Sequence, residues 1–304
     1  MTSSGTMQPL SGTSLTSSGL MSSGGLVQWP PEAPVWSFQW QMVDGDSEAI
    51  SFTGVHYKGQ KVLHKASLPM IRVQYDGPAG PYKDALSSGN MQGPVKVYEG
   101  TNPAYRFLVV ESYHTIGAYR LTNRWIFRSD GIILPQLYSA GLQAPYNHRH
   151  HAYWRFDFDI VGAADNLALE HLPVGTDWGY GAGWLPYTTE SVVARSPRST
   201  YAVLNKANPL GRTTGYLIAP GPFDGVADGF GRLDAAVLTY RAAEDLRGRL
   251  GTSQDDQILT QATGESINGQ DLVLWWCAHL GHHASEGGNE WHVCGPILQP
   301  FGYP

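Results

Sequence analysis

Apolar and polar residues alternate along many short segments of the chain, a pattern typical of strands with one buried face. The clearest case runs from Ala152 to Ile160, where every second residue is apolar and Arg155 and Asp157 lie between them. Turn-forming pairs such as Asp130-Gly131 separate the segments. The alternation predicts strands at 51–57, 61–65, 69–75, 95–99, 106–112, 117–128, 132–138, 151–161, 201–205, 214–219, 236–241 and 271–278.

Helical patterns are weak by comparison and occur only at 242–250 and 253–261. Parallel strands need long crossovers that are usually helical, and this chain has too few helical segments to supply them. We therefore predict an all-β fold, a large antiparallel β-sandwich. With 304 residues, of which 42% are hydrophobic, the chain can bury a sizeable core. The Ser-, Gly- and Thr-rich residues 1–34 are expected to form a disordered tail before a folded domain at 35–304.

Charge and hydropathy narrow the range of partners. The net charge is −6 and no basic run occurs, which argues against nucleic acid and anionic membranes. No apolar run is long enough to span a bilayer. The first basic residue is Lys58, and a secretory signal needs a cationic start, so we expect a cytoplasmic location or leave the location unassigned. Cys277 and Cys294 can either pair or stay reduced, and the sequence leaves both options open.

The pair His148 and His150 is the strongest chemical signal in the chain. Residues i and i+2 of a strand point to the same face, so both imidazoles reach one metal ion, and imidazole is a common ligand of copper and zinc. Their parity is that of the apolar residues, which places them on the core side, with Asp157 and Asp159 facing outward. Most of the eleven histidines lie in 148–151 and 279–292, so a third ligand is expected from the second group.

Two further groups of residues, three aspartates and one tyrosine, can be interpreted either as ordinary structural residues or as parts of a functional site. Asp157, Asp159 and Asp271 suit a hard cation such as calcium, or are solvated strand residues. Tyr119 has the apolar parity of its strand, and by itself reads as a core tyrosine, whereas Arg120 faces the other way.

Four stretches together resemble the catalytic β-sandwich domain of the copper amine oxidases, over about residues 36–304. The family's copper motif is matched by His148-Arg-His150 followed by Arg155-Phe-Asp157-Phe-Asp159, and its third copper histidine by His282, seven residues after Trp275. Its cofactor stretch is similar to Thr115-Ile-Gly-Ala-Tyr119 followed by Trp125-Ile-Phe127. A fourth match is Ala66-Ser-Leu-Pro-Met70 leading to Tyr75.

The resemblance implies a copper- and O2-dependent oxidoreductase that converts a small-molecule or peptidyl primary amine to an aldehyde, ammonia and peroxide. In that reading His148, His150 and His282 bind Cu(II), and Tyr119 is oxidised to topaquinone, to which Tyr75 hydrogen-bonds. The family's dimer implies a homodimer. The family's calcium-type site maps onto side chains and carbonyls of residues along two strands: Asp157, Phe158, Asp159, Asp271 and Leu272.

The chain departs from the family where the catalytic base lies. The family's Tyr-x-Asp aligns with Ala85-Leu-Ser87, which puts a serine at the base position and an alanine at the gate aromatic. A second alignment places Tyr82-Lys-Asp84 on the same motif. Ala118 and Arg120 also replace the residues beside the cofactor tyrosine. A serine hydroxyl cannot replace a carboxylate base, so the first alignment predicts atypical chemistry and poor turnover of simple amines. An inactive copper-binding protein and a zinc hydrolase are the alternatives.

Overall fold

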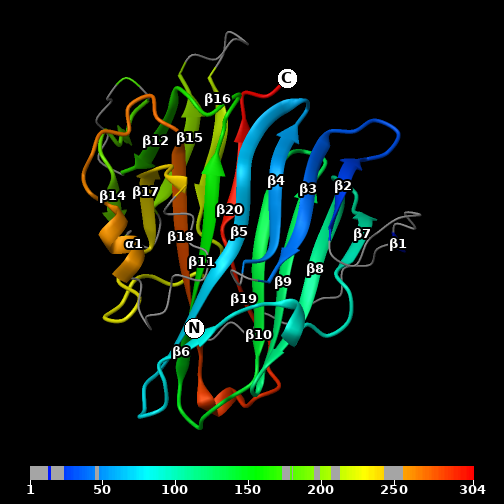
Figure 1. Ribbon diagram of the computed structural model, residues 1–304, viewed down its shortest axis with the longest axis vertical. Coiled ribbons are helices and arrows are strands. Elements are labelled where there is room, and N and C mark those ends of the chain that lie inside the picture. Colours follow the sequence, from blue (N-terminus) through cyan, green and yellow to red (C-terminus); the bar gives the residue numbers. More distant parts are fainter. Residues whose placement is uncertain are drawn as a thin grey trace.

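The computed structural model of the protein describes residues 13–14, 24–44, 48–172, 179, 181–194, 199–206, 213–242 and 256–304. Within these residues the strands form two antiparallel sheets, one of eleven strands and one of nine (Figure 1). The predicted all-β class and antiparallel sandwich are confirmed. Among the described residues, no helix has the length and apolar character that a membrane-crossing segment needs.

The eleven-stranded sheet contains the hairpin β8–β9, and β9 supplies the tyrosine of the predicted cofactor stretch. In spatial order its strands are β1 (Thr13–Ser14), β7 (Lys96–Thr101), β8 (Arg106–Ile116), β9 (Tyr119–Arg128), β10 (Ile133–Ala140), β20 (Ile297–Phe301), β16 (Thr214–Ala219), β15 (Thr200–Asn205), β12 (Asn166–His171) and β13 (Trp184–Pro186), with β19 (His292–Cys294) paired to β10.

The nine-stranded sheet holds the histidine-bearing strands at its centre. In spatial order its strands are β14 (Ser191–Val193), β17 (Ala235–Thr239), β18 (Leu272–His282), β11 (His148–Phe158), β5 (Gln60–Tyr75), β4 (Ala49–Tyr57), β3 (Trp36–Val43) and β2 (Gly24–Trp29), with β6 (Tyr82–Asp84) paired to β5. The short helices are η1 (Ser88–Asn90), α1 (Asp256–Gln261) and η3 (Ala284–Glu286).

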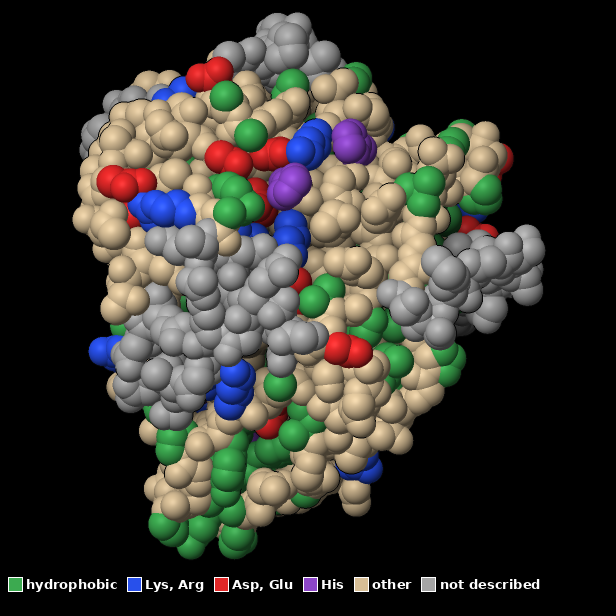
Figure 2. Space-filling view, in the orientation of Figure 1, with side chains coloured by type: hydrophobic (Ala, Val, Ile, Leu, Met, Phe, Trp, Pro, Cys, Tyr) green, Lys and Arg blue, Asp and Glu red, His purple; other side chains and the backbone are tan. Residues whose placement is uncertain are grey.

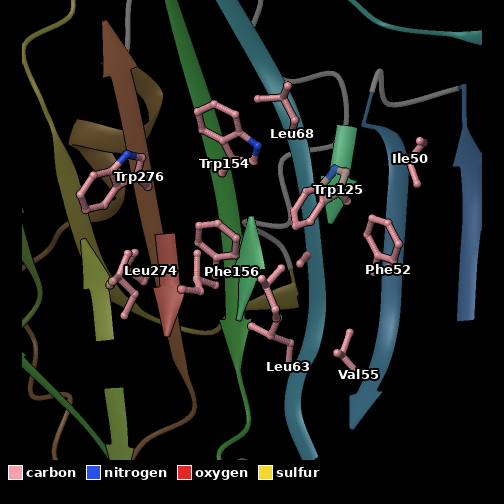
Figure 3. Close-up of a cluster of buried hydrophobic side chains, with 14 of the residues drawn as sticks. Ile50, Phe52, Val55, Leu63, Leu68, Trp125, Trp154, Phe156, Leu274 and Trp276 are labelled. Carbon is pink, nitrogen blue, oxygen red and sulfur yellow. The ribbon is translucent and has the colours of Figure 1, made fainter. Parts of the chain in front are cut away.

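The main core lies between the two sheets and is rich in aromatic side chains (Figure 3). Trp125 of β9 packs against Phe52 of β4, with ring centroids 4.9 Å apart, and 6.3 Å from Phe156 of β11. Trp154 and Trp276 come from the adjacent central strands and are fully buried. The inward parity predicted for β11 is therefore confirmed, because its even-numbered apolar residues belong to this core.

Strand β5 replaces two predicted strands, 61–65 and 69–75. Its interior contains Pro69, which has no N–H to donate to a neighbouring strand. The register with β11 shifts at this point: Tyr153 pairs with Met70 and Arg155 with Ser67. Two residues of β5 thus oppose one of β11, which is a β-bulge, and such bulges are among the few places where a sheet tolerates proline.

Two expectations from the sequence are wrong. The expected tail extended to residue 34, but Gly24–Trp29 form β2, paired along its whole length with β3. The outward face of β11 was expected to meet solvent, but Asp157 is only 1% exposed. A second apolar cluster covers this face, with Ile258 of α1 and Trp275 of β18 among its members. Residues 242–250, where a helical pattern was noted, lie almost entirely outside the described residues.

Candidate active site

The predicted copper ligands and the two predicted tyrosines meet at one end of the sandwich, where the central strands begin or end (bottom of Figure 1). His148, the first residue of β11, pairs with His282 on β18 and with Tyr75 on β5. Tyr119, the first residue of β9, approaches from the opposite sheet. Antiparallel pairing thus gathers residues that are far apart in the sequence, such as Tyr75 and His282.

The ring distances define a compact cluster. The His148 imidazole lies 5.1 Å from that of His150 and 4.9 Å from that of His282, between centroids. The Tyr119 ring lies 4.8 Å from His150 and 5.4 Å from His148. Tyr75 stacks on His148 at 4.8 Å, and its hydroxyl contacts the hydroxyl of Tyr119. All five side chains are buried. The structure therefore brings the three predicted copper ligands and the two predicted tyrosines together.

The other histidines of the second group occupy different places. His279 lies on the opposite face of β18, against His151. His283 is exposed just before η3. His292 of β19 packs on His282, with centroids 4.3 Å apart, and its Nε2 lies 3.6 Å from a Glu286 carboxylate oxygen. Sequence reasoning did not assign His292, although it belongs to the histidine-rich stretch that was noted.

A tight hairpin places Tyr119 at the start of β9. Ile116 pairs with Tyr119, so only Gly117 and Ala118 form the turn. Gly117 has φ of 57°, a left-handed conformation that glycine adopts without strain, and a Cβ there would collide with the Gln143 amide. Gln143 accepts the Ala118 N–H at 2.7 Å and donates its own backbone N–H to the Tyr75 hydroxyl at 3.1 Å.

Arg120 points away from the cluster, as its parity predicts. Its guanidinium donates to the Gly288 carbonyl at 2.7 Å and lies over the Trp291 ring. The residue is exposed, whereas Tyr119 beside it is only 2% exposed. The arginine therefore does not place its charge among the histidines.

Burial keeps the imidazoles of the cluster neutral. It lowers the pKa of His148 to about 4, and the neighbouring His282 acts in the same direction. Burial also holds the pKa of His150 well below its ordinary value and lowers the pKa of His282. Burial raises the pKa of the Tyr119 phenol, as does its hydrogen bond with Tyr75. The cluster at neutral pH thus consists of uncharged imidazoles, the form that binds metals, and uncharged phenols.

The cluster offers nitrogen donors to a metal ion, and on this face the side chains whose ligand atoms lie within 4.8 Å of one another are those of His282, Glu286 and His292. His282 Nε2 lies 2.9 Å from the Gly287 carbonyl oxygen, which only accepts, so this nitrogen carries the proton and Nδ1 keeps its lone pair. That Nδ1 is buried and has no hydrogen-bond partner among the described residues, and the same holds for Nδ1 of His150. Buried polar atoms are normally paired. Metal-binding histidines commonly donate their second ring N–H to a carbonyl, as His282 does.

Asp84 is a buried carboxylate at the edge of this cluster. Its Oδ2 lies 3.7 Å from His150 Nε2, and its charge acts on the pKa of both Tyr75 and Tyr119. Burial raises the pKa of Asp84 to about 7, although the nearby Arg72 guanidinium lowers it. Two residues before it, Tyr82 is 39% exposed, and its ring lies 6.1 Å from that of Tyr75. Asp84 thus contacts the histidine cluster, and Tyr82 lies at its exposed border.

Ser87 lies in a different setting, at the start of η1. Its backbone N–H donates to the Asn90 side chain at 3.2 Å, and Asn90 in turn donates to the carbonyl of Ala85 at 2.7 Å. Within the described part of the chain, contacts with the histidine cluster are found for Asp84 and not for Ser87. These contacts favour the alignment that sets Tyr82-Lys-Asp84 on the family's motif.

The second predicted site lies at the other end of β11 and β18. Carboxylate oxygens of Asp157, Asp159 and Asp271 lie within 4.8 Å of one another. Burial raises the pKa of Asp271 to about 7, and the two neighbouring carboxylates add to the effect. Lys61 forms an ion pair with Asp159. Phe158 and Leu272, whose carbonyls were predicted ligands, face each other across the two strands. Acidic, basic and histidine side chains gather on this upper part of the molecule (Figure 2).

We expect calcium to raise the melting temperature and a chelator to lower it, because a cation relieves the repulsion among these carboxylates. At about 100 times its Kd, a ligand that binds only the native state stabilises it by about 2.7 kcal/mol. Asp159→Asn should remove the calcium response, whereas Asp130→Asn, a control at an exposed turn, should keep it. Differential scanning calorimetry measures both. A melting temperature that ignores calcium and chelator would contradict the site.

Comparison with known proteins rests on structure. No protein-family model matches the chain, and no curated protein matches it in sequence. An amine oxidase of Aspergillus nidulans superposes with a TM-score of 0.69 at 17% identity, over 89% of this chain and 52% of that protein. A copper-containing benzylamine oxidase of Hansenula polymorpha gives 0.68 at 17% identity, over 91% and 62%. The fold is that of the amine oxidases.

A lysyl oxidase of Pichia pastoris has the same fold, with a TM-score of 0.66 at 16% identity, over 88% of this chain and 51% of that protein. The chain therefore spans between 51% and 62% of the length of these amine oxidases. At this identity the likeness establishes the amine-oxidase fold alone. The chemistry has to be argued from the residues that the fold brings together.

Proposed function

We propose that the protein is a copper-dependent oxidoreductase that oxidises primary amines with O2. One observation carries the proposal: the imidazoles of His148, His150 and His282 lie in one buried cluster, and the buried phenol of Tyr119 lies 4.8 Å from the His150 ring, between centroids. Copper storage or zinc-dependent hydrolysis would require the three histidines but would not require a buried phenol beside them. Oxidation of the phenol to a quinone requires both.

His148, His150 and His282 would hold the copper ion. Three neutral imidazoles are a ligand set that suits Cu(II). When bound, copper would supply the oxidation of Tyr119 by O2 to a quinone, whose carbonyl accepts electrons from an amine. The protein's own part is to hold the phenol beside the metal ligands in a buried setting. Tyr75 fixes the direction of the Tyr119 hydroxyl, because the two hydroxyls are in contact.

Asp84 is the proposed general base. The oxidation of an amine requires loss of a proton from the carbon that bears the nitrogen, and a buried carboxylate beside the reacting ring can take it. Asp84 meets this description, since it is 4% exposed and lies next to His150. With Asp84 in this role the atypical chemistry expected from Ser87 is not required, so we propose ordinary primary amines, either small molecules or amines on peptides, as substrates. We also propose that the protein forms a homodimer, as its resemblance to the copper amine oxidases implies.

We expect His148→Ala to lose stoichiometric copper, because it removes one of three ligands and the ring that touches the other two. The matched control is His283→Ala, an exposed histidine of the same segment, which should bind copper like the unaltered protein. Metal analysis after dialysis measures both. Full copper retention by His148→Ala would contradict the assignment, and zinc held in preference to copper would favour a hydrolase.

A further inference from the structure

A second group of metal-type side chains lies on the back of the two histidine-bearing strands. His151, Cys277 and His279 each offer a ligand atom, and these atoms lie within 4.8 Å of one another. His151 pairs with His279 across β11 and β18, and Cys277 is two residues before His279 on the same face. All three are buried, at most 4% exposed. Neither Cys277 nor Cys294 forms a disulfide.

This group is separate from the proposed copper site. Successive residues of a strand point to opposite faces, so His150 faces the core and His151 the outer face. The rings confirm this, because His150 contacts Tyr119 whereas His151 contacts His279 and Phe230. The two groups therefore share strands but share no ligand.

The contact between the two rings aligns the nitrogens that would bind a metal. A carboxylate oxygen of Asp234 lies 3.2 Å from His279 Nε2, which favours the tautomer with the proton on that nitrogen. His279 Nδ1 then accepts a hydrogen bond from His151 Nδ1, 2.7 Å away. The remaining ring nitrogen of His151, Nε2, is buried and has no hydrogen-bond partner among the described residues. A carboxylate behind a ring nitrogen is the usual support of a metal-binding histidine.

We propose that His151, Cys277 and His279 form a buried structural zinc site. Two imidazoles and a thiolate match the preference of Zn²⁺, with Zn–N of about 2.0–2.1 Å and Zn–S of about 2.3 Å. Tetrahedral geometry at those lengths sets the two nitrogens about 3.3 Å apart, so the rings separate by about 0.6 Å. On binding, the His151 proton moves to Nε2, and the Cys277 thiol releases its proton to solvent.

The segment that covers the group gives the site its role. Gly231 packs directly on it, since a Cβ at that position would lie 2.3 Å from His151 Nδ1. The Phe230 ring lies tilted against the His151 ring, with centroids 5.2 Å apart, and the Asp228 carboxylate accepts the N–H groups of Phe230 and Gly231 at 2.8 Å. This stretch has little regular structure. A zinc ion beneath it ties the covering segment to the central strands, which identifies the site as structural.

Cobalt is the probe that isolates this site, because Co²⁺ bound to a thiolate has an intense near-ultraviolet charge-transfer band that cobalt on imidazoles lacks. The full chain with excess Co²⁺ should develop this band, and Zn²⁺ should abolish it by displacement. Cys277→Ser should lose the band completely. The matched control is Cys294→Ser, which alters the other buried cysteine and should keep it.

X-ray absorption of the zinc-loaded unaltered protein supplies a test that does not depend on how well a variant folds. A sulfur shell at about 2.3 Å is expected. A zinc spectrum with nitrogen and oxygen neighbours only would overturn the proposal, and so would a cobalt band that survives Cys277→Ser. Because the proposed copper site contains no sulfur, these results are independent of whether that site binds copper.

Discussion

Tyr119→Phe is expected to bind copper and yet form no quinone. The substitution removes one hydroxyl from a ring that is 2% exposed and keeps the packing against His148 and His150. The phenol oxygen is where the oxidation to a quinone begins, so quinone staining and visible absorption after copper loading in air should fall to background. Peptide mass spectrometry around residue 119 identifies the modified residue in the unaltered protein.

The control for this variant is Tyr75→Phe. It removes the other hydroxyl of the same contact and leaves the Tyr75 ring stacked on His148. We expect it to retain staining, with slower development because Tyr119 loses the partner that orients it. Staining of Tyr119→Phe equal to that of the unaltered protein would disprove the assignment. Loss of copper together with staining would instead show a structural role for the phenol.

Asp84→Asn is expected to lower the turnover of primary amines by about 10²–10⁴-fold, which is the usual contribution of a general base. Asparagine has nearly the same shape as aspartate, so the contact with His150 is kept while the proton acceptor is lost. The decrease should appear in kcat, with copper content and quinone staining unchanged. Peroxide release from a panel of monoamines and diamines measures it.

Ser87→Ala is the matched comparison, since Ser87 holds the base position in the other alignment. We expect near-normal turnover, because Ser87 lies at the start of η1 and its contacts described above are with Asn90 rather than with the histidine cluster. If Ser87→Ala were the damaging variant and Asp84→Asn the silent one, the first alignment would be correct. Slow peroxide release by the unaltered protein would argue against Asp84 as an effective base.

The alternation of apolar and polar residues predicted correctly which side chains share a face of the central strands. This prediction needs only the local rule that successive side chains of a strand point to opposite faces. It placed His148 and His150 with the core and Asp157 on the opposite side. Alternation could not show that this opposite side is also buried, since the cover comes from α1 and an irregular segment with no period to detect. The grouping of His151, Cys277 and His279 was missed because it depends on the pairing of β11 with β18.

Strands that are short or of unusual composition could not be predicted from the sequence. The strand β2 lies in a Gly- and Ser-rich stretch, and its pairing with β3 supplies the backbone hydrogen bonds that its composition does not predict. The strand β6 has only three residues, too few for a pattern, yet it positions the proposed base: Asp84 pairs with Ile71, and its carboxylate lies 3.7 Å from His150 Nε2. The positions of these strands depend on which strand each one pairs with, and a single sequence does not show this pairing.

The unbroken register of β11 and β18 makes the chemistry of both faces vulnerable to a single deletion. The two strands pair from His148–His282 to Phe158–Leu272 without a shift. Removing one residue within 149–157 would reverse the direction of every side chain on one side of the deletion. Either the imidazoles would then point out or the carboxylates would point in. We expect natural variants of this protein to differ in length only in the loops, never within these two strands.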